Sequence, residues 1–373
     1  MKTILVTGSA GFIGRHLCLA LHRTADTRVL PFDLPGTREE MREMVRQADF
    51  VYHLAGVNRP RDEAEFQSGN VDLTRGLCDA LRGAGRSAPL VLSSSIQAEQ
   101  DNPYGRSKRA AEEEVRRYRR ESGARVFILR LPNVFGKWSR PDYNSVVATF
   151  CHHLARGRPV QINRRDSVIR LAYIDDVVRR LKGLCEETDQ DAERTEYGVD
   201  PVFSITVGEL HDRLVAFRDQ RKTARLPDLS DPFTRYLYAT FLSFCPPDGL
   251  AYDPGLKNDD RGWLFEMIQS PGAGQIFVSR TKPGVTRGHH YHDTKAERFC
   301  VVKGTGTIRL RPVGGADIVT YTVSDRDVRV VDIPPGFTHS IENQGADDMI
   351  TIFWASEVFD SRRPDTYAER VEP

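Results

Sequence analysis

The chain has 373 residues, enough for two domains, and its 53 basic and 52 acidic residues almost cancel. This balance argues against nucleic acid or membrane as a partner, and no apolar run approaches the ~20 residues that a membrane-spanning helix needs. The first seven residues lead directly into a strand pattern without an apolar signal core. The six cysteines have no paired spacing, so we expect a reducing, cytoplasmic location.

A glycine-rich turn follows the first expected strand, residues 3–7. The turn contains Gly8, Gly11 and Gly14, and a helical pattern then runs to about residue 22. Glycines permit a tight turn and close backbone approach, and the helix N-terminus attracts a pyrophosphate. Strand, turn and helix therefore predict a dinucleotide site. Asp33 ends the second strand, about 20 residues further on, where a carboxylate can hold the adenosine ribose. The alternative for Asp33 is a turn or helix cap.

Strand-like and helical segments continue to alternate. Strands are expected at residues 50–55, 90–95 and 126–131, with helices at about 71–82 and from 104 until Gly123. This alternation predicts an α/β fold with a doubly wound parallel sheet of Rossmann type.

Tyr104 and Lys108 are four residues apart on the long helix, so their side chains share one face. An ammonium group beside a phenol lowers the phenol's pKa, which makes Tyr104 a candidate acid for protonating an alkoxide during hydride transfer. A serine from the preceding strand end could hold the carbonyl oxygen. The alternative is an exposed helical pair without function.

Several motifs resemble those of the extended short-chain dehydrogenase/reductases over about residues 1–240. They are Thr7-Gly8-x-x-Gly11-x-x-Gly14, Asp49-Phe-Val-Tyr-His53-Leu-Ala-Gly, Asn70, Ser93-Ser-Ser95, Tyr104-x-x-x-Lys108 and Arg130-Leu-Pro-Asn133-Val-Phe-Gly136. The resemblance implies catalysis by Ser95 (or its neighbour Ser94), Tyr104 and Lys108, often on a nucleotide-linked sugar. The cofactor contacts expected from it are Gly8, Gly11, Phe12, Ile13, Gly14, Arg15, Asp33, Leu54, Ala55, Tyr104 and Lys108.

Substrate contacts are expected in the later part of this domain. Asn133 follows the strand after the catalytic helix. Arg170, together with Arg164 and Arg165, is a candidate for diphosphate recognition, because a guanidinium forks onto phosphate. A solvated basic surface is the alternative for each arginine.

Turn-forming residues between about 221 and 260 indicate a junction, so we expect one domain at residues 1–245 and a second at 246–373. Beyond residue 261 the pattern changes to short strands, at about 263–267, 275–279, 298–302, 307–311 and 349–354. Short strands separated by glycine turns predict an all-β, double-sheet barrel.

Three histidines and a glutamate with metal-ligand chemistry lie among these strands: His290, His292, Glu297 and His339. His290 and His292 are two apart on a strand and face the same side. Imidazole and carboxylate suit zinc, iron, nickel or manganese. Surface histidines on a loop are the alternative.

The segments Gly284 to Gly304 and Pro334-Pro-Gly336-Phe-Thr-His339-Ser-Ile-Glu-Asn343 resemble the two motifs of the cupin family, although Val328 stands where a glycine is usual. The resemblance implies a jelly-roll barrel that holds a divalent metal, for which we expect zinc. It also implies a homodimer that forms through this domain.

The whole chain resembles the CapF-type (FnlB- or WbjC-like) enzymes of capsule and O-antigen synthesis. The segments that carry this resemblance are Ser93-Ser-Ser-Ile-Gln-Ala, Asp101-Asn-Pro-Tyr104-Gly-x-Ser-Lys108 and His290-x-His292-x-Thr-Lys-x-Glu297. It implies a bifunctional enzyme for UDP-2-acetamido-2,6-dideoxy-β-L-arabino-hexos-4-ulose, a UDP-linked 4-keto-6-deoxy amino sugar. The cupin domain would epimerise C3, and the first domain would reduce C4 with NADPH. The product would be UDP-2-acetamido-2,6-dideoxy-β-L-talose, a precursor of the N-acetyl-L-fucosamine nucleotide.

Several alternatives remain at the level of sequence. Asp33 favours NADH, because a carboxylate repels a 2′-phosphate, unless Arg15 and Arg38 offset it. The cupin could merely dimerise or bind sugar beside a C4 reductase, the sugar could be that of the N-acetyl-L-quinovosamine route, or the protein could be a non-catalytic sensor. The base that takes the C3 proton is not identified; His289, Tyr291, Asp293 and Lys295 all lie near the ligands.

Overall fold

The computed structural model describes residues 1–187, 193–220 and 223–372. The chain divides into two compact units, Met1–Leu214 with Ala239–Cys245, and Val215–Tyr238 with Pro246–Pro373. The domain boundary expected at residues 245 and 246 stays a prediction.

A six-stranded parallel sheet forms the centre of the first unit, in the order β2-β1-β3-β4-β5-β8. β3 and β4 are buried along their whole length, as expected for strands covered on both faces. The strands are β1 (Lys2–Thr7), β2 (Thr27–Phe32), β3 (Phe50–His53), β4 (Leu90–Ser95), β5 (Val126–Leu131) and β8 (Glu196–Tyr197). This topology confirms the predicted doubly wound sheet.

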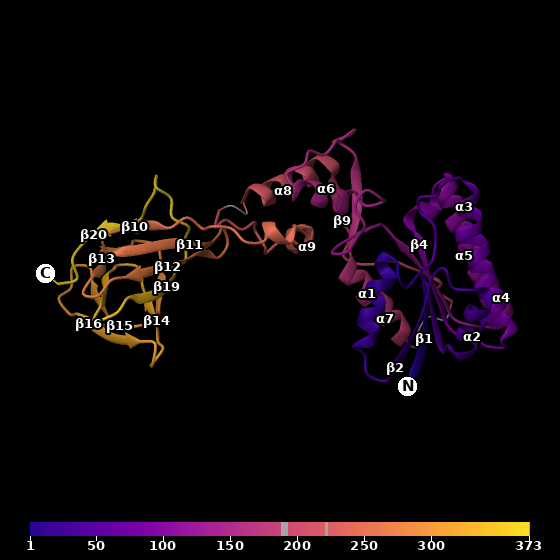
Figure 1. The fold of residues 1–373 in the computed structure, drawn as a ribbon, viewed down its shortest axis with the longest axis horizontal. Coiled ribbons are helices and arrows are strands. Elements are labelled where there is room, and N and C mark those ends of the chain that lie inside the picture. The colour runs from indigo at the N-terminus through magenta and orange to yellow at the C-terminus, as the bar shows by residue number, and fades with distance from the viewer. Residues whose placement is uncertain (188–192, 221–222, 373) are drawn as a thin grey trace. The chain divides into compact units, whose positions relative to one another are not determined.

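Helices cover both faces of that sheet (Figure 1). α1 and α7 pack together on one face, while α4 packs between α2 and α5 on the other. Their bounds are α1 (Phe12–His22), α2 (Arg38–Gln47), α3 (Ala64–Phe66), η1 (Gln67–Asp72), α4 (Leu73–Gly83), η2 (Ile96–Glu99), α5 (Pro103–Ser122) and α7 (Ile174–Glu186).

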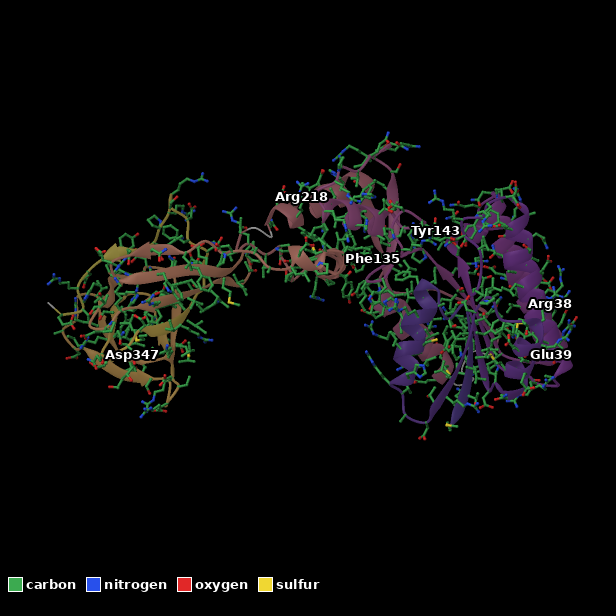
Figure 2. All side chains as sticks on the ribbon, in the orientation of Figure 1. Arg38, Glu39, Phe135, Tyr143, Arg218 and Asp347 are labelled. Carbon is green, nitrogen blue, oxygen red and sulfur yellow. The ribbon has the colours of Figure 1, made fainter. Side chains whose placement is uncertain are left out.

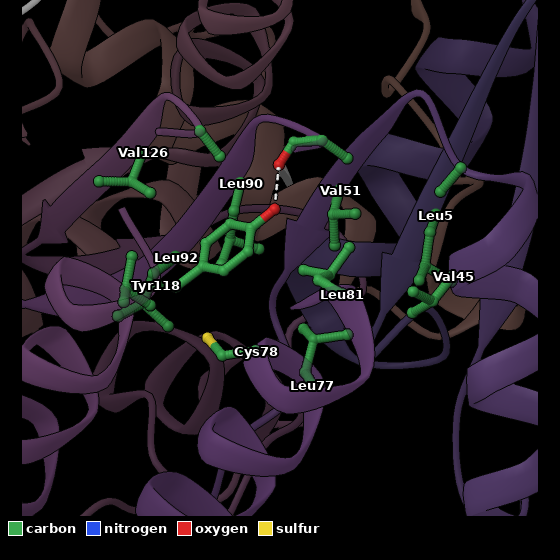
Figure 3. Close-up of a cluster of buried hydrophobic side chains, with 14 of the residues drawn as sticks. Leu5, Val45, Val51, Leu77, Cys78, Leu81, Leu90, Leu92, Tyr118 and Val126 are labelled. Carbon is green, nitrogen blue, oxygen red and sulfur yellow. Dashed lines mark hydrogen bonds between the residues drawn. The ribbon is translucent and has the colours of Figure 1, made fainter. Parts of the chain in front are cut away.

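The core between the sheet and α4 and α5 is apolar and fully buried (Figure 3). Leu90 and Leu92 of β4 meet Leu77 and Leu81 of α4 there. Tyr118 of α5 brings a hydroxyl into this core and donates it to the Ala88 carbonyl at 2.9 Å, so the buried polar group is satisfied.

α5 has clear start and stop signals. The Asn102 side chain accepts a hydrogen bond from Gly105 N at 2.7 Å, and Pro103 occupies the first turn. Gly123, with φ of 71°, ends the helix in the left-handed conformation, as the sequence predicted. These caps fix the register of the helix that carries Tyr104 and Lys108.

A three-stranded sheet completes the first unit, in the order β6-β7-β9. Its strands are β6 (Asn133–Phe135), β7 (Val168–Tyr173) and β9 (Phe203–Thr206). The remaining helices among the described residues are α6 (Val146–Leu154), α8 (Val207–Gln220), α9 (Pro232–Ser243) and the short η3 (Pro247–Gly249). Among the described residues, no helix combines the length and apolar character that crossing a bilayer requires.

The second unit contains two antiparallel sheets that enclose one core, which confirms the predicted double-sheet architecture. The first sheet has the order β10 (Lys257–Asp259), β11 (Gly262–Ser270), β12 (Gly274–Thr281), β19 (Met349–Ala355), β14 (Glu297–Lys303) and β17 (Val330–Ile333). The second has the order β16 (Val319–Ser324), β15 (Thr305–Pro312), β18 (Phe337–Asn343), β13 (Thr286–Tyr291) and β20 (Tyr367–Ala368).

Candidate active and metal sites

The glycine turn after β1 packs backbone against backbone. Gly8 has φ of +71°, and a Cβ there would lie 2.6 Å from the Ala55 nitrogen. A Cβ on Gly14 would lie 2.0 Å from the Gly8 carbonyl oxygen. Asp33 ties the end of β2 to this turn, because Oδ2 accepts a hydrogen bond from Ala10 N at 2.8 Å. The structure thus brings Gly8, Gly14, Asp33 and Ala55 together, and the role of the predicted cofactor residues stays a prediction.

Ser95, Tyr104 and Lys108 also converge. Ser95 ends β4, and its side chain lies close enough to Tyr104 of α5 to influence the pKa of that phenol. Lys108 is 7 % exposed and donates from Nζ to the Ser93 carbonyl at 3.0 Å. The short segment between the serines and the tyrosine forms η2, and Ser95 Oγ caps it by accepting from Gln97 N at 3.1 Å.

The direction of the Tyr104 pKa shift differs from the one expected from the sequence. Burial raises the pKa of Tyr104, although the Ser95 side chain acts in the opposite direction. Burial also lowers the pKa of Lys108 to about 8, against the opposing charge of Glu112. The expected lowering of the tyrosine pKa by the lysine was wrong, because burial of the phenol dominates. Tyr104 is protonated at neutral pH and can serve as an acid.

The neighbouring Ser94 has a different partner. Its Oγ donates to Glu112 Oε1 at 2.5 Å, and Arg130 donates to both oxygens of Glu112, at 3.0 and 2.7 Å. Burial tends to raise the pKa of Glu112, but the bonds from Arg130 and Ser94 outweigh it and lower this pKa. The sequence analysis missed Glu112. Its signal was its place four residues after Lys108, on the same face of α5.

Asn133 lines a hollow, or surface pocket, near β6. The other lining residues are Arg59, Asp142, Tyr143, Asn144, Ser145, Val146, Thr149 and Ile169, and Tyr143 is labelled in Figure 2. Asn133 pairs in register with Leu171, so it shares a sheet face with Ile169. Arg170, between those two residues of β7, lies on the opposite face by strand alternation. The assignment of Asn133 and Arg170 to substrate stays a prediction.

The other two arginines expected to recognise diphosphate lie beside carboxylates. Arg165 pairs with Asp212 at 2.7 Å, and Arg164 lies 3.8 Å from Asp166. A second hollow, which shares Arg59 with the first, is also lined by Arg61 and Arg140. These three arginines were not predicted, because they come from two loops whose proximity no local pattern indicates.

The four predicted metal ligands form one cluster in the second unit. One donor atom from each of His290, His292, Glu297 and His339 lies within 4.8 Å of the others. His290 on β13 pairs directly with His339 on β18, next to a bulge at Gly288. Glu297 Oε2, at the start of β14, lies 3.3 Å from His292 Nε2 and 3.2 Å from His339 Nε2.

The ring orientations leave nitrogen lone pairs directed into the cluster. Nδ1 of His339 lies 3.2 Å from the Phe337 carbonyl oxygen, and Nδ1 of His292 contacts the Asp365 carbonyl oxygen. When Nδ1 carries the proton, Nε2 becomes a ligand, and Nε2 of both rings is buried without a hydrogen-bond partner. Buried ring nitrogens without a hydrogen-bond partner are suited to bind a metal ion.

The pKa shifts within the cluster differ from ligand to ligand. Burial lowers the pKa of His290 to about 4, with His339 and His292 acting in the same direction. Burial tends to raise the pKa of Glu297, but the adjacent His292 and His339 outweigh it and lower this pKa to about 2. Burial tends to lower the pKa of His292, but Glu297 and the Asp365 carbonyl outweigh it and raise this pKa. Imidazoles beside an ionised carboxylate are a donor set that zinc and similar divalent ions bind, and binding of the metal releases any imidazolium proton.

The polar residues around the cluster do not single out one base. His289 has φ of 58°, and Val371 N lies 3.5 Å from its Nδ1. Tyr291 stacks on Tyr367 with ring centroids 5.1 Å apart. Lys295 is buried and donates from Nζ to the Pro364 carbonyl at 3.1 Å.

The chain matches two family models, one in each part. Residues 4–199 match the NAD dependent epimerase/dehydratase family, and residues 257–367 match the Polysaccharide biosynthesis C-terminal domain. The second match describes the metal-cluster region by a name other than cupin, so the cupin assignment stays a prediction.

Known proteins are similar over the full length. The UDP-2-acetamido-2,6-beta-L-arabino-hexul-4-ose reductase of Pseudomonas aeruginosa is 45% identical over 365 residues, 98% of either chain. The crystal structure of the capsular polysaccharide assembling protein CapF from Staphylococcus aureus has a TM-score of 0.89 and 44% identity, covering 98% of this chain and 99% of CapF.

A UDP-glucuronic acid 4-epimerase from Bacillus cereus, solved in complex with UDP-glucuronic acid and NAD, shares only the fold. Its identity is 19%, with a TM-score of 0.52 over 59% of this chain and 82% of the epimerase. The chain belongs to the NAD dependent epimerase/dehydratase family and, over its whole length, to the family of CapF-like proteins.

Proposed function

We propose that this protein is a cytoplasmic enzyme of nucleotide-sugar metabolism that reduces the C4 ketone of UDP-2-acetamido-2,6-dideoxy-β-L-arabino-hexos-4-ulose. The observation that carries the proposal is the 45% identity, from end to end, with the Pseudomonas reductase of the corresponding hexulose. The convergence of Ser95, Tyr104 and Lys108 supports reductase chemistry.

A nicotinamide cofactor, when bound, would supply the hydride for C4. Ser95 Oγ hydrogen-bonds with the ketone oxygen and holds it beside Tyr104. Tyr104 donates its proton as negative charge develops on that oxygen, a role for which its raised pKa leaves the proton in place. Lys108 binds the cofactor from the same face of α5, anchored by its bond to the Ser93 carbonyl.

We propose NADPH as the cofactor, following the resemblance to CapF-type enzymes. Asp33 alone favours NADH. Arg38, which is exposed at the start of α2 (Figure 2), is the better candidate to offset its charge, because the Arg15 guanidinium lies over the Trp138 ring at 4.5 Å. Initial rates with each cofactor test this. Preference for NADPH that Arg38→Ala abolishes is expected, and faster turnover with NADH would contradict the assignment.

We propose that the second unit epimerises C3 before the reduction. The ketone acidifies the neighbouring C3–H, so one group can remove that proton and another can return it on the opposite face. His290, His292, Glu297 and His339 would hold zinc, which when bound supplies a Lewis acid for the ketone or enolate oxygen. Reduction at C4 then removes the acidifying carbonyl and fixes the new configuration, giving the talose nucleotide.

One experiment separates the two activities. The 4-keto sugar is incubated in deuterium oxide without cofactor, and then with NADPH, and the products are followed by NMR. Wild type should incorporate deuterium at C3 and form the talo product. Tyr104→Phe should retain exchange and lose reduction, and His290→Ala should lose exchange.

The alternatives give different results in the same experiment. Undiminished exchange in metal-free His290→Ala would contradict metal-assisted epimerisation. No exchange in wild type, together with C4 reduction, would indicate a reductase whose second unit only dimerises or binds sugar. A product with the opposite configuration at C4 would indicate the N-acetyl-L-quinovosamine route. Failure to oxidise NADPH would contradict the reductase itself.

We propose a homodimer that forms through the outer face of the β12-containing sheet. Val330, Cys300 and Ile352 lie side by side across β17, β14 and β19, and the row continues to Val278 on β12. Val330 is 62 % exposed and Ile352 is 39 % exposed. An apolar row of this kind on a sheet face favours association with another protein surface.

A further inference from the structure

Residues 356–372, here called the C-terminal strap, run beside the strands that carry the metal cluster. β20 within the strap pairs with β13, placing Ala368 opposite His290 and Tyr367 opposite Tyr291. On the other side, Thr338 of β18 donates its hydroxyl to the Glu369 carbonyl at 2.6 Å. The strap therefore contacts the residues next to two of the candidate ligands.

A buried arginine anchors the far end of this strap. Arg311, 8 % exposed on β15, donates to the carbonyls of Val371 and Arg370 at 2.8 Å each and to the Glu369 carboxylate at 2.7 Å. Val371 itself is fully buried. Because these contacts lie outside the cluster, the far end of the strap is held without the candidate ligands.

Asp365 connects the strap to the cluster through two different groups. Its carbonyl oxygen contacts Nδ1 of His292, which fixes the ring with Nε2 toward the cluster. Its carboxylate accepts backbone N–H bonds from Asp293 at 2.9 Å, Thr294 at 3.2 Å and Lys295 at 3.0 Å. Those three residues form the turn between His292 and Glu297. One residue thus orients one ligand and holds the turn that leads to the next.

We propose that Asp365 is a positioning residue of the metal site, and that the C-terminal strap is a part of that site. The inference rests on the proposed metal-dependent function. Partners that orient metal ligands without touching the metal commonly contribute 10–100-fold in affinity. Here the partner lies 73 residues beyond His292 in the sequence, so neither ligand motif contains it.

The test is zinc affinity, measured on the full-length protein after metal removal, by competition with a chromogenic chelator. Asp365 has φ of 41°, so Asp365→Gly removes the carboxylate without backbone strain. We expect zinc binding about 10–100-fold weaker than wild type. Asp360→Gly is the matched control, because that carboxylate also accepts a backbone N–H, from Arg362 at 2.9 Å, in the same segment but away from the ligands. It should keep wild-type affinity.

Two further measurements keep the inference separate from folding and from the proposed function. Asp365→Asn, which retains an acceptor oxygen and tolerates left-handed backbone, should have intermediate affinity. In cobalt-substituted protein, Asp365→Gly should shift the visible absorption bands, which report ligand geometry. Wild-type zinc affinity and an unchanged cobalt spectrum in Asp365→Gly would overturn the inference alone. Failure of wild type itself to bind zinc would overturn the proposed metal and this inference with it.

Discussion

Glu112 lies four residues after Lys108 on α5, and the two side chains hold consecutive residues of the same strand. Glu112 accepts from Ser94 Oγ at 2.5 Å, and Lys108 donates to the Ser93 carbonyl at 3.0 Å. The end of β4 is thereby fixed to the helix that carries Tyr104. Ser95, the next residue, receives its position from these contacts.

The first prediction concerns the stability of this arrangement. Glu112→Ala leaves Arg130 and Ser94 without their buried partner, so it should lower the free energy of unfolding of the first unit by about 3 kcal/mol. Urea unfolding followed by the helical circular dichroism signal measures this, since the second unit is mainly strands. Glu113→Ala, at an exposed neighbour, is the control and should change stability by less than about 0.5 kcal/mol. Equal effects of the two substitutions would contradict the prediction.

The second prediction distinguishes the adjacent serines. Ser95→Ala removes the hydroxyl beside Tyr104, so kcat for C4 reduction should fall about 10²-fold, and the loss of its cap on η2 should lower the free energy of unfolding by about 1 kcal/mol. Ser94→Ala removes a partner of Glu112 and should lower stability with a smaller effect on kcat. Steady-state kinetics and urea unfolding of both variants measure the two effects. A larger kcat loss in Ser94→Ala would reverse the assignment.

The third prediction is a pH dependence of stability that arises at His53. This ring lies between Thr7 and Thr74, with ring nitrogens 2.6 and 2.9 Å from their hydroxyl oxygens. Burial lowers the pKa of His53 to about 3, and the charge of Lys108 adds to the effect. Unfolded histidine takes up its proton near pH 6.5, whereas the folded ring remains neutral until about pH 3.

The stability from neutral His53 is therefore complete above about pH 6.5 and declines on acidification, by about 1.4 kcal/mol per pH unit. His53→Gln, which cannot titrate, should show a slope shallower by that amount when urea unfolding of the first unit is repeated at decreasing pH. Identical slopes for the variant and wild type would show that His53 is not the responsible group.

The fourth prediction concerns the proposed dimer. Ile352→Glu places a charge in the middle of the apolar row on the first sheet of the second unit and should weaken dimerisation. Val319→Glu is the control, because Val319 has a similar exposure, 44 %, on β16 of the other sheet. Sedimentation velocity over a range of concentrations should show monomer only for Ile352→Glu. Dissociation by Val319→Glu instead would place the interface on the other sheet.

Periodicity and motif spacing predicted most of the fold because both are local. Alternating strands and helices specify a parallel sheet, and His290 and His292 face one side of a strand wherever the strand is placed. The partners of these groups were not predictable. Glu112 meets Arg130, and His292 meets Asp365, only after distant segments pack. The direction of the Tyr104 pKa shift also depends on burial, which a helical spacing of four residues does not reveal.

The cluster in the second unit has a thermodynamic consequence. Its four ligands come from β13, the turn after it, β14 and β18, and one ring is oriented by the strap, so the donors are together only when the whole unit is folded. An ion held there contributes its binding free energy to folding. Each tenfold excess of free metal over Kd would add about 1.4 kcal/mol. The melting temperature of this unit should then rise with free metal concentration, while that of the first unit stays constant.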